Sequence, residues 1–249
     1  MHDLIIASEP LASSLVIFKG GANGNVAPLR VIQGPHTQLH QPWGVAVDPK
    51  HNEIWEADYG NAHVAAYPLF GNGDVAPLRV ISSSKAGMRL DSGVAVDPER
   101  NLVVVAARDA HYRGAIYIFN RTDNGDLAPQ RVIAGPTTGI LGLWHVQTYG
   151  GKIYAAVLEM NYRPPYDPAG DAPMPGCKGP ISEFSPSPLG FVGVWNITDN
   201  GDVAPRAIIR GTQTRLSNAL GLALDPRDGE IFASGAGNAV MAYLVPAFF

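Results

Sequence analysis

The chain has 249 residues, 46% of them hydrophobic, so it can bury a large core as one repetitive domain or two ordinary ones. With 18 Lys plus Arg against 22 Asp plus Glu, a formal charge of −4 gives no electrostatic case for binding nucleic acid or an anionic membrane. No apolar run reaches the roughly 18 residues of a membrane-spanning helix, and the first ten residues lack the basic start and apolar core of a signal peptide.

A ten-residue pattern occurs four times in the sequence. The copies are NGNVAPLRVI from Asn23, NGDVAPLRVI from Asn72, NGDLAPQRVI from Asn124 and NGDVAPRAII from Asn200. Asn-Gly tolerates the positive φ of a tight hairpin, so each copy predicts a hairpin that leads into a strand. The Ala-Pro pair lacks an N–H that a central strand would need, which favours the outermost strand of a sheet.

The copies define a repeat of about fifty residues, with an insertion before the last copy. Each repeat contains four short apolar segments that predict strands and no segment with a helical period. In the second repeat the segments span 44–48, 53–59, 63–67 and 76–81, and in the third 93–97, 102–107, 115–119 and 128–133. Four short antiparallel strands repeated in this way predict the blades of a β-propeller.

Two segments, PWGVAVDP from Pro42 and NEIWEADYGNAHV from Asn52, resemble the NHL-repeat family of β-propellers. The resemblance implies that Gly-Val-Ala-Val-Asp forms the innermost strand, and it favours a secreted, periplasmic or cell-surface location. The fourth repeat departs from this pattern, because Trp144-His145-Val146-Gln147-Thr148 replaces the element and places His145 where other repeats have Val or Leu.

Residues 1–249 are therefore predicted to form one all-β domain, a propeller of about five four-stranded blades with a Pro/Gly-rich insertion at 161–190. Residues 4–8 and 15–18 align with second and third strands, and the chain ends after a third strand at 241–245. Two blades are thus one strand short. Imperfect ring closure, a fragment of a longer six-bladed propeller and completion by a partner chain remain open alternatives.

Polar and aromatic residues gather in the connections expected at one face of the propeller, the inter-blade loop face, and the insertion is expected to fold over it. The predicted binding surface comprises His36, Trp43, His63, Arg89, Tyr112, Arg113, Tyr162, Arg163, Tyr166, Arg215 and Asn218. Asp48, Asp97 and Asp225 recur at one position and are interpreted as turn residues, and Arg30, Arg79 and Arg131 as packing or pairing residues of outer strands.

The leading hypothesis is a non-enzymatic binding or assembly propeller that contacts a protein or another ligand through this face, with self-association through open blade edges. No cofactor is predicted. The alternative is a metal-dependent lactonase, lyase or hydrolase, with His40, Asp91, His111 and His145 as candidate catalytic residues and His40, Asp91 and His145 as candidate ligands of a divalent metal. Asn120 and Asn196 begin candidate glycosylation sequons.

Overall fold

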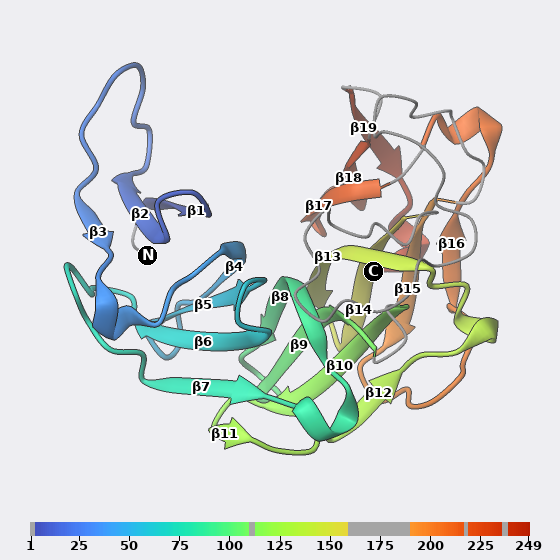
Figure 1. The fold of residues 1–249 in the computed structure, drawn as a ribbon. Coiled ribbons are helices and arrows are strands. Elements are labelled where there is room, and N and C mark those ends of the chain that lie inside the picture. The colour runs from blue at the N-terminus through green and yellow to red at the C-terminus, as the bar shows by residue number, and fades with distance from the viewer. Residues whose placement is uncertain (1–2, 110–112, 159–189, 217–218, 236–238) are drawn as a thin grey trace, which may run out of the picture.

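The computed structural model describes residues 3–109, 113–158, 190–216, 219–235 and 239–249, without the side chains of 90 and 91. These residues form five small sheets built of antiparallel strands. Figure 1 shows that the sheets follow one another around an arc, which is the arrangement of a five-bladed β-propeller. The all-β propeller predicted from the sequence is confirmed.

The strands run from inner to outer position in chain order. Blade 1 contains β1 (Leu4–Glu9), β2 (Ser14–Lys19) and β3 (Arg30–Ile32), and blade 2 contains β4 (Pro42–Asp48), β5 (Glu53–Asp58), β6 (His63–Pro68) and β7 (Arg79–Ser82). Blade 3 contains β8 (Arg89–Asp97), β9 (Leu102–Arg108), β10 (Gly114–Asn120) and β12 (Arg131–Ile133). Blade 4 contains β13 (Gly142–Tyr149), β14 (Lys152–Leu158), β15 (Phe191–Asn196) and β16 (Ala207–Ile209), and blade 5 contains β17 (Ala219–Asp225), β18 (Glu230–Gly235) and β19 (Ala239–Leu244).

The remaining elements are short. A two-residue strand, β11 (Gly125–Asp126), adds to the outer edge of blade 2 in parallel with β7. The 3₁₀ helices are η1 (Pro35–Thr37), η2 (Ser84–Ala86), η3 (Pro136–Thr138), η4 (Thr212–Thr214) and η5 (Pro246–Phe248). In the described part of the chain, no helix has the length and apolarity needed to cross a membrane.

The hydrophobic cores lie between neighbouring blades, because the middle strands of blades 2 to 4 bury side chains on both of their faces. In β5, Trp55 and Ala57 pack toward blade 3, whereas Ile54 packs toward Leu15 and Ile17 of blade 1. All five of these side chains are fully buried. This explains why the middle strands consist of nearly continuous apolar runs rather than alternating polar and apolar residues.

The inner strands of adjacent blades approach each other closely at one glycine position. A Cβ atom added to Gly44 of β4 would lie 2.7 Å from the Cα of Gly93 in β8, and one added to Gly93 would lie 2.8 Å from the carbonyl oxygen of Trp144 in β13. The Gly-Val-Ala-Val-Asp element therefore begins with glycine because two backbones meet there. The aspartates that end this element behave as predicted, since Asp48 accepts the N–H of His51 and Asp97 accepts that of Arg100.

Three Asn-Gly-Asp segments, 72–74, 124–126 and 200–202, link blades 2, 3 and 4 to the outer strand of the preceding blade. We call these segments clasps. In each clasp the asparagine side chain accepts the central N–H of that outer strand, from Val31, Val80 or Val132, at 2.9–3.1 Å. The aspartate accepts an N–H just beyond the strand, from His36, Ser84 or Thr137, at 2.7–2.9 Å. The clasps thus fasten neighbouring blades together.

This geometry corrects one prediction. The Asn-Gly pair does not form a tight hairpin, because β6 ends at Pro68 and β7 begins at Arg79, and the clasp runs beside β3 in between, where Gly73 makes a parallel bridge to Ile32. Gly73 does adopt the expected positive φ, 76°. The prediction that Arg-Val-Ile forms the outermost strand is confirmed for β3 and β12, and in blade 2 only the two-residue β11 lies outside β7.

The two ends of the arc present uncovered sheet faces. Blades 1 and 5 lie at opposite ends of the arc and do not meet (Figure 1). Ile5 of β1 is 46% exposed, although the register gives it the position of the fully buried Ile54 in β5. Val240 of β19 is 72% exposed and corresponds to Val192 of β15, which is fully buried. Both faces are of the kind that a neighbouring blade covers elsewhere in the molecule.

Candidate functional site

The inner strands of blades 2 to 5 share a β-bulge close to their first residues. The register shifts between Pro42 and Gly44, between Arg89 and Gly93, between Leu143 and His145, and between Ala219 and Gly221. A bulge breaks the regular alternation of side chains and redirects the extra residue. Regular pairing resumes at Gly44, Gly93, His145 and Gly221. The residues just before these positions lie where the inner strands begin, at the inter-blade loop face, and they are Trp43, Ser92, Trp144 and Leu220.

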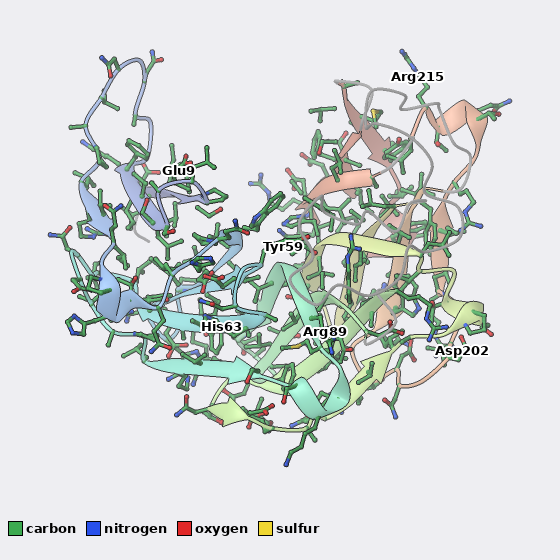
Figure 2. The ribbon with its side chains drawn as sticks, viewed as in Figure 1. Glu9, Tyr59, His63, Arg89, Asp202 and Arg215 are labelled. Carbon is green, nitrogen blue, oxygen red and sulfur yellow. The ribbon has the colours of Figure 1, made fainter. Side chains whose placement is uncertain are left out.

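Three aromatic rings meet at this position, and we call Trp43, Tyr59 and Trp144 the aromatic cluster. The ring of Trp43 contacts Trp144 edge to face at a centroid distance of 4.8 Å and Tyr59 at 5.5 Å. Trp43 is 37% exposed, and Figure 2 shows Tyr59 toward the interior of the arc. The small Ser92 takes the corresponding position in blade 3, where its hydroxyl donates to the carbonyl of Leu143 at 2.8 Å, so rings from blades 2 and 4 can meet across it.

His145 lies beside this cluster, on the inner strand of blade 4. Its Nδ1 accepts the backbone N–H of Leu222 in blade 5 at 2.9 Å, which leaves the proton of the neutral ring on Nε2. Burial lowers the pKa of His145 from its ordinary value, so the imidazole is neutral at pH 7.

The strand register corrects the position that the sequence suggested for His145. His145 pairs with Ala156, as Gly44 pairs with Ala57 and Gly93 with Ala106. His145 therefore replaces the recurrent glycine and not a Val or Leu. The bulge residue is Trp43 in blade 2 and Trp144 in blade 4, so matching the two tryptophans gives this correspondence, whereas the prediction aligns Trp144 with Gly44.

A buried group of ionisable residues lies in blade 2, on the side that faces blade 1, and we call Glu56, Asp58 and His63 the buried triad. Glu56 and Asp58 are two residues apart on β5 and so share one face of the strand, and His63 pairs directly with Asp58 across the β5–β6 hairpin. One ligand-type atom from each of the three lies within 4.8 Å of the others. Glu56 and Asp58 are fully buried, and His63 is 8% exposed.

Among blades 2 to 5, blade 2 alone has polar residues at the three positions of the buried triad. Pairing across the sheets identifies the corresponding residues as Val105, Ala107 and Ala115 in blade 3, Ala155, Val157 and Phe191 in blade 4, and Ala233, Gly235 and Ala239 in blade 5. The fold does not need polar groups at these positions. Burying ionisable groups is costly unless partners compensate, so their presence requires a specific explanation.

Asp58 has a clear structural role within the triad. Its carboxylate accepts the backbone N–H of His40 at 2.6 Å, of Gln41 at 3.2 Å and of Asn61 at 3.0 Å. These bonds fix the connection from blade 1 to blade 2 and the turn between β5 and β6. The exposed His40 covers that turn, because a Cβ atom added to Gly60 would lie 2.3 Å from its ring.

The triad is electrostatically distinctive. Burial lowers the pKa of His63, and the negative charge of Asp58 offsets this effect only in part, so His63 is neutral at pH 7. Burial, with the charges of Glu56 and Asp58, raises the pKa of the neighbouring Tyr67, whose hydroxyl donates to the carbonyl of Thr37 at 2.5 Å. Blade 2 thus holds two carboxyl groups and a neutral imidazole in its interior, beneath the inter-blade loop face.

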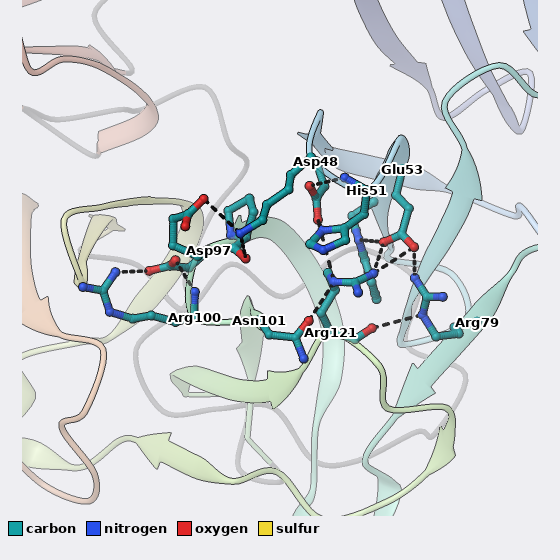
Figure 3. A network of polar contacts seen from close by, with 12 residues as sticks. Asp48, His51, Glu53, Arg79, Asp97, Arg100, Asn101 and Arg121 are labelled. Atoms are coloured by element: carbon teal, nitrogen blue, oxygen red, sulfur yellow. Dashed lines mark hydrogen bonds and ion pairs between the residues drawn. The ribbon is translucent and has the colours of Figure 1, made fainter.

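A second polar network lies at the opposite end of the strands (Figure 3). Glu53 binds Arg79 of its own blade and Arg121 of blade 3, and Arg121 also bonds to Asn101 at 2.9 Å. Burial alone would raise the pKa of Glu53, but the hydrogen bonds from Arg79 and Arg121 outweigh burial and lower it. Every charge of this network has an opposite partner, which is typical of structural ion pairs and confirms the pairing role predicted for Arg79.

The remaining residues of the predicted surface are dispersed. His36 is exposed and bonds to Asp74 of the first clasp at 2.6 Å, while Arg113 is exposed and bonds to Asp109. Arg89 and Arg215 are exposed, whereas His63 is buried. Of the candidate glycosylation sites, the Asn120 side chain bonds to Asp123 at 3.1 Å, and Asn196 ends β15. His111, Tyr112, Tyr162, Arg163, Tyr166, Asn218, nearly all of the 161–190 insertion and the side chain of Asp91 fall outside the described residues.

None of the metal ligands predicted from the sequence belongs to the buried triad. Among the described side chains, Glu56, Asp58 and His63 are the one group of three His, Cys, Asp or Glu residues close enough to hold an ion. Sequence reasoning placed His63 on the surface and missed Glu56 and Asp58. The available signal was the pair of acidic residues two apart in a strand that is otherwise apolar.

Comparisons with known proteins bear on the fold. No protein-family model matches the chain, and no curated protein matches it. Among solved structures, hydrazine synthase from Kuenenia stuttgartiensis superposes with a TM-score of 0.59 at 12% identity, over 95% of this chain and 54% of that one. The chain thus spans about half the length of that protein. In all, 542 solved chains match, which shows a widely used fold that does not select a function by itself. These comparisons identify the chain as a β-propeller.

Proposed function

We propose that the protein is a non-enzymatic binding propeller that holds a protein partner on its inter-blade loop face. The aromatic cluster is the observation that supports this proposal most strongly. Trp and Tyr side chains are enriched among the residues that dominate binding energy at protein interfaces. Here bulges on two non-adjacent blades bring Trp43 and Trp144 together, and Trp43 remains partly exposed.

The chemistry of the surrounding face is compatible with such an anchor. The exposed arginines Arg89 and Arg215 belong to segments that begin or precede inner strands, β8 and β17. An apolar centre with a polar, charged rim is the usual anatomy of a protein-binding surface. The NHL-repeat resemblance of the Gly-Val-Ala-Val-Asp strands and the extracytoplasmic location that it favours belong to the same proposal.

A capture experiment tests the proposal. The immobilised protein, Trp43→Ala and the control Phe70→Ala are exposed to extract from the source cells, and bound proteins are quantified by mass spectrometry. Phe70 is an exposed aromatic residue beyond β6, and it lies outside the aromatic cluster. We expect a partner that binds the unmodified protein and Phe70→Ala alike and binds Trp43→Ala at least about tenfold less. Identical sets of bound proteins on all three would refute the proposal.

The alternative, a metal-dependent lactonase, lyase or hydrolase, is supported by His145. Its neutral imidazole lies at the start of an inner strand, and because Nδ1 accepts the Leu222 N–H, the Nε2–H is the group that could donate a hydrogen bond to a substrate oxygen. Turnover of a panel of lactones by the metal-supplemented protein, abolished in His145→Gln, would favour this alternative. The absence of turnover across the panel would count against it.

A further inference from the structure

We propose that the buried triad is a binding site for one divalent transition-metal ion. Glu56 and His63 are the principal ligands and Asp58 is the third. The proposal is independent of the partner-binding function, because the triad faces blade 1 inside the molecule, whereas the aromatic cluster lies at the surface.

The geometry of the triad suits chelation. Its three ligand-type atoms lie within 4.8 Å of one another. Two ligands that bind one zinc ion at about 2.0–2.2 Å are separated by roughly 3–4 Å. A shift of less than about 1 Å, within the freedom of the Glu56 side chain, therefore brings the atoms to coordination distance. The cross-strand pair Asp58–His63 holds two of the ligands on a rigid hairpin, which reduces the entropy lost on binding.

His63 provides the second and independent observation. Its Nε2 atom is buried and forms no hydrogen bond with any described residue. The nearest carboxylate oxygen, Oε1 of Glu56, is 3.8 Å away, which is too long for a hydrogen bond. A buried imidazole nitrogen without a hydrogen bond is costly, and the neutral form of the ring is the form that binds metals. A metal ion bound between Nε2 and the carboxylates would give this nitrogen a partner.

The donor set indicates the class of metal. One imidazole and two carboxylates form a mixed nitrogen and oxygen site, which suits Zn²⁺, Mn²⁺ or Fe²⁺ better than Ca²⁺ or Mg²⁺, whose sites consist of oxygen ligands. Asp58 already accepts three backbone N–H groups, so we assign it a single remaining lone pair and expect water to complete the coordination. The backbone bonds to Asp58 would then orient this ligand.

The experiment measures zinc binding to the whole chain in a Cys177→Ser background, which removes the one thiol as a competing ligand. Chelator-treated protein is titrated with Zn²⁺ at pH 7.5 by calorimetry, and its melting temperature is recorded with and without metal. The variants are His63→Ala and the isosteric Glu56→Gln. The control is His51→Ala, which removes a histidine that bonds to Asp48 at 2.7 Å at the opposite end of the strands.

We expect one equivalent of Zn²⁺ to bind the parent protein and His51→Ala and to raise their melting temperatures. Binding should weaken by at least about 100-fold in His63→Ala and Glu56→Gln, and the zinc-dependent shift in melting temperature should disappear. If His63→Ala does not fold, the isosteric Glu56→Gln decides. The proposal is overturned if the parent protein binds no stoichiometric zinc, or if Glu56→Gln binds zinc as tightly as the parent.

Discussion

Glu53 ties blades 2 and 3 together through a single carboxylate. It is 5% exposed and binds Arg79 of blade 2 and Arg121 of blade 3, and it also accepts the indole N–H of Trp55 at 3.1 Å. Removing one partner of a buried ion pair leaves an uncompensated charge and typically costs about 3–5 kcal/mol. We expect Glu53→Ala to lower the free energy of unfolding by an amount in this range, measured by denaturant titration at pH 7.

The matched control for this prediction is Glu99, which pairs with Lys50 at 3.1 Å, also across blades 2 and 3, but on the surface. Glu99→Ala should change the free energy of unfolding by at most about 1 kcal/mol, because exposed ion pairs contribute little. Equal effects of the two substitutions would contradict the assignment. Since the pKa of Glu53 is lowered by folding, its contribution is present above about pH 4.5 and is lost as the pH falls below that value.

His145 should make the folded state sensitive to acid. Burial lowers its pKa in the folded protein, so below about pH 6.5 the unfolded chain binds the proton more readily than the folded chain. Stability contributed by this residue is therefore complete above pH 6.5 and declines as the pH falls through 6.5 toward the lower folded pKa. We expect the parent protein to lose more unfolding free energy than His145→Gln between pH 7 and 5, and parallel curves would contradict the prediction.

The bond from Leu222 to His145 allows a further test. His145→Leu preserves the approximate bulk of the side chain but removes the nitrogen that accepts the Leu222 N–H. The unsatisfied N–H should lower the free energy of unfolding by about 1–3 kcal/mol. His145→Gln retains an acceptor and should recover part of this loss. Denaturant titration at pH 7.5, where the imidazole is neutral, separates this effect from the acid sensitivity.

The clasps act between elements, and the chain supplies its own control for them. Asn124 accepts the N–H of Val80 at 2.9 Å, whereas the side chain of Asn23 in the first copy binds no outer strand among the described residues. We expect Asn124→Ala to lower the unfolding free energy by about 0.5–1.5 kcal/mol and Asn23→Ala to change it by less than about 0.5 kcal/mol. Equal losses in the two variants would show that the asparagine acts within its own loop instead.

The same elements show how far the sequence could predict the structure. The Arg-Val-Ile segments, the Asp-Pro turns and the order of the strands depend on local signals, and these predictions are confirmed. The clasps were not predicted, because the acceptor on Asn72 and the N–H of Val31 are 41 residues apart and meet only when two blades pack. The prediction misplaced His145 because it aligned Trp144 with Gly44, although Trp144 corresponds to the bulge residue Trp43, a match that the two tryptophans offer in the sequence itself.

The buried triad was missed for a related reason. Its members are separated by two and five residues, but their proximity depends on the register of the β5–β6 hairpin, which pairs Asp58 with His63. The alternation of β5 does place Glu56 and Asp58 on one side, so the proximity of two of the three members could be read from the sequence. The sequence could not show which neighbouring blade buries that side, because this depends on how whole sheets are arranged.

At the scale of the molecule, the uncovered faces of blades 1 and 5 should drive self-association of the isolated chain. Ile5, Val240 and Leu244 are exposed at these ends, and exposed apolar sheet faces and unpaired strand edges favour association. Light scattering coupled to size exclusion should give a mass that rises with concentration above the 26.4 kDa of one chain.

A double variant, Ile5→Lys with Val240→Lys, tests which surface is responsible. Lysines on both faces should restore the mass of a single chain, because like charges oppose the approach of the two faces. The matching control is Leu11→Lys, which alters a residue that is 98% exposed in the turn between β1 and β2. A strict monomer at all concentrations would contradict the prediction, as would an assembly that is unaffected by the double variant.

The clasps also imply an order of assembly. The residues that fasten β3 belong to blade 2, and those that fasten β7 and β12 belong to blades 3 and 4. Blades 1, 2 and 3 are therefore not complete when their own strands have formed. During synthesis from the N-terminus, Val31, Val80 and Val132 precede the asparagines that fasten their strands by 41, 44 and 68 residues. A chain that stalls after an outer strand and before the clasp that fastens it therefore exposes an open strand edge, which is available to pair with other strands.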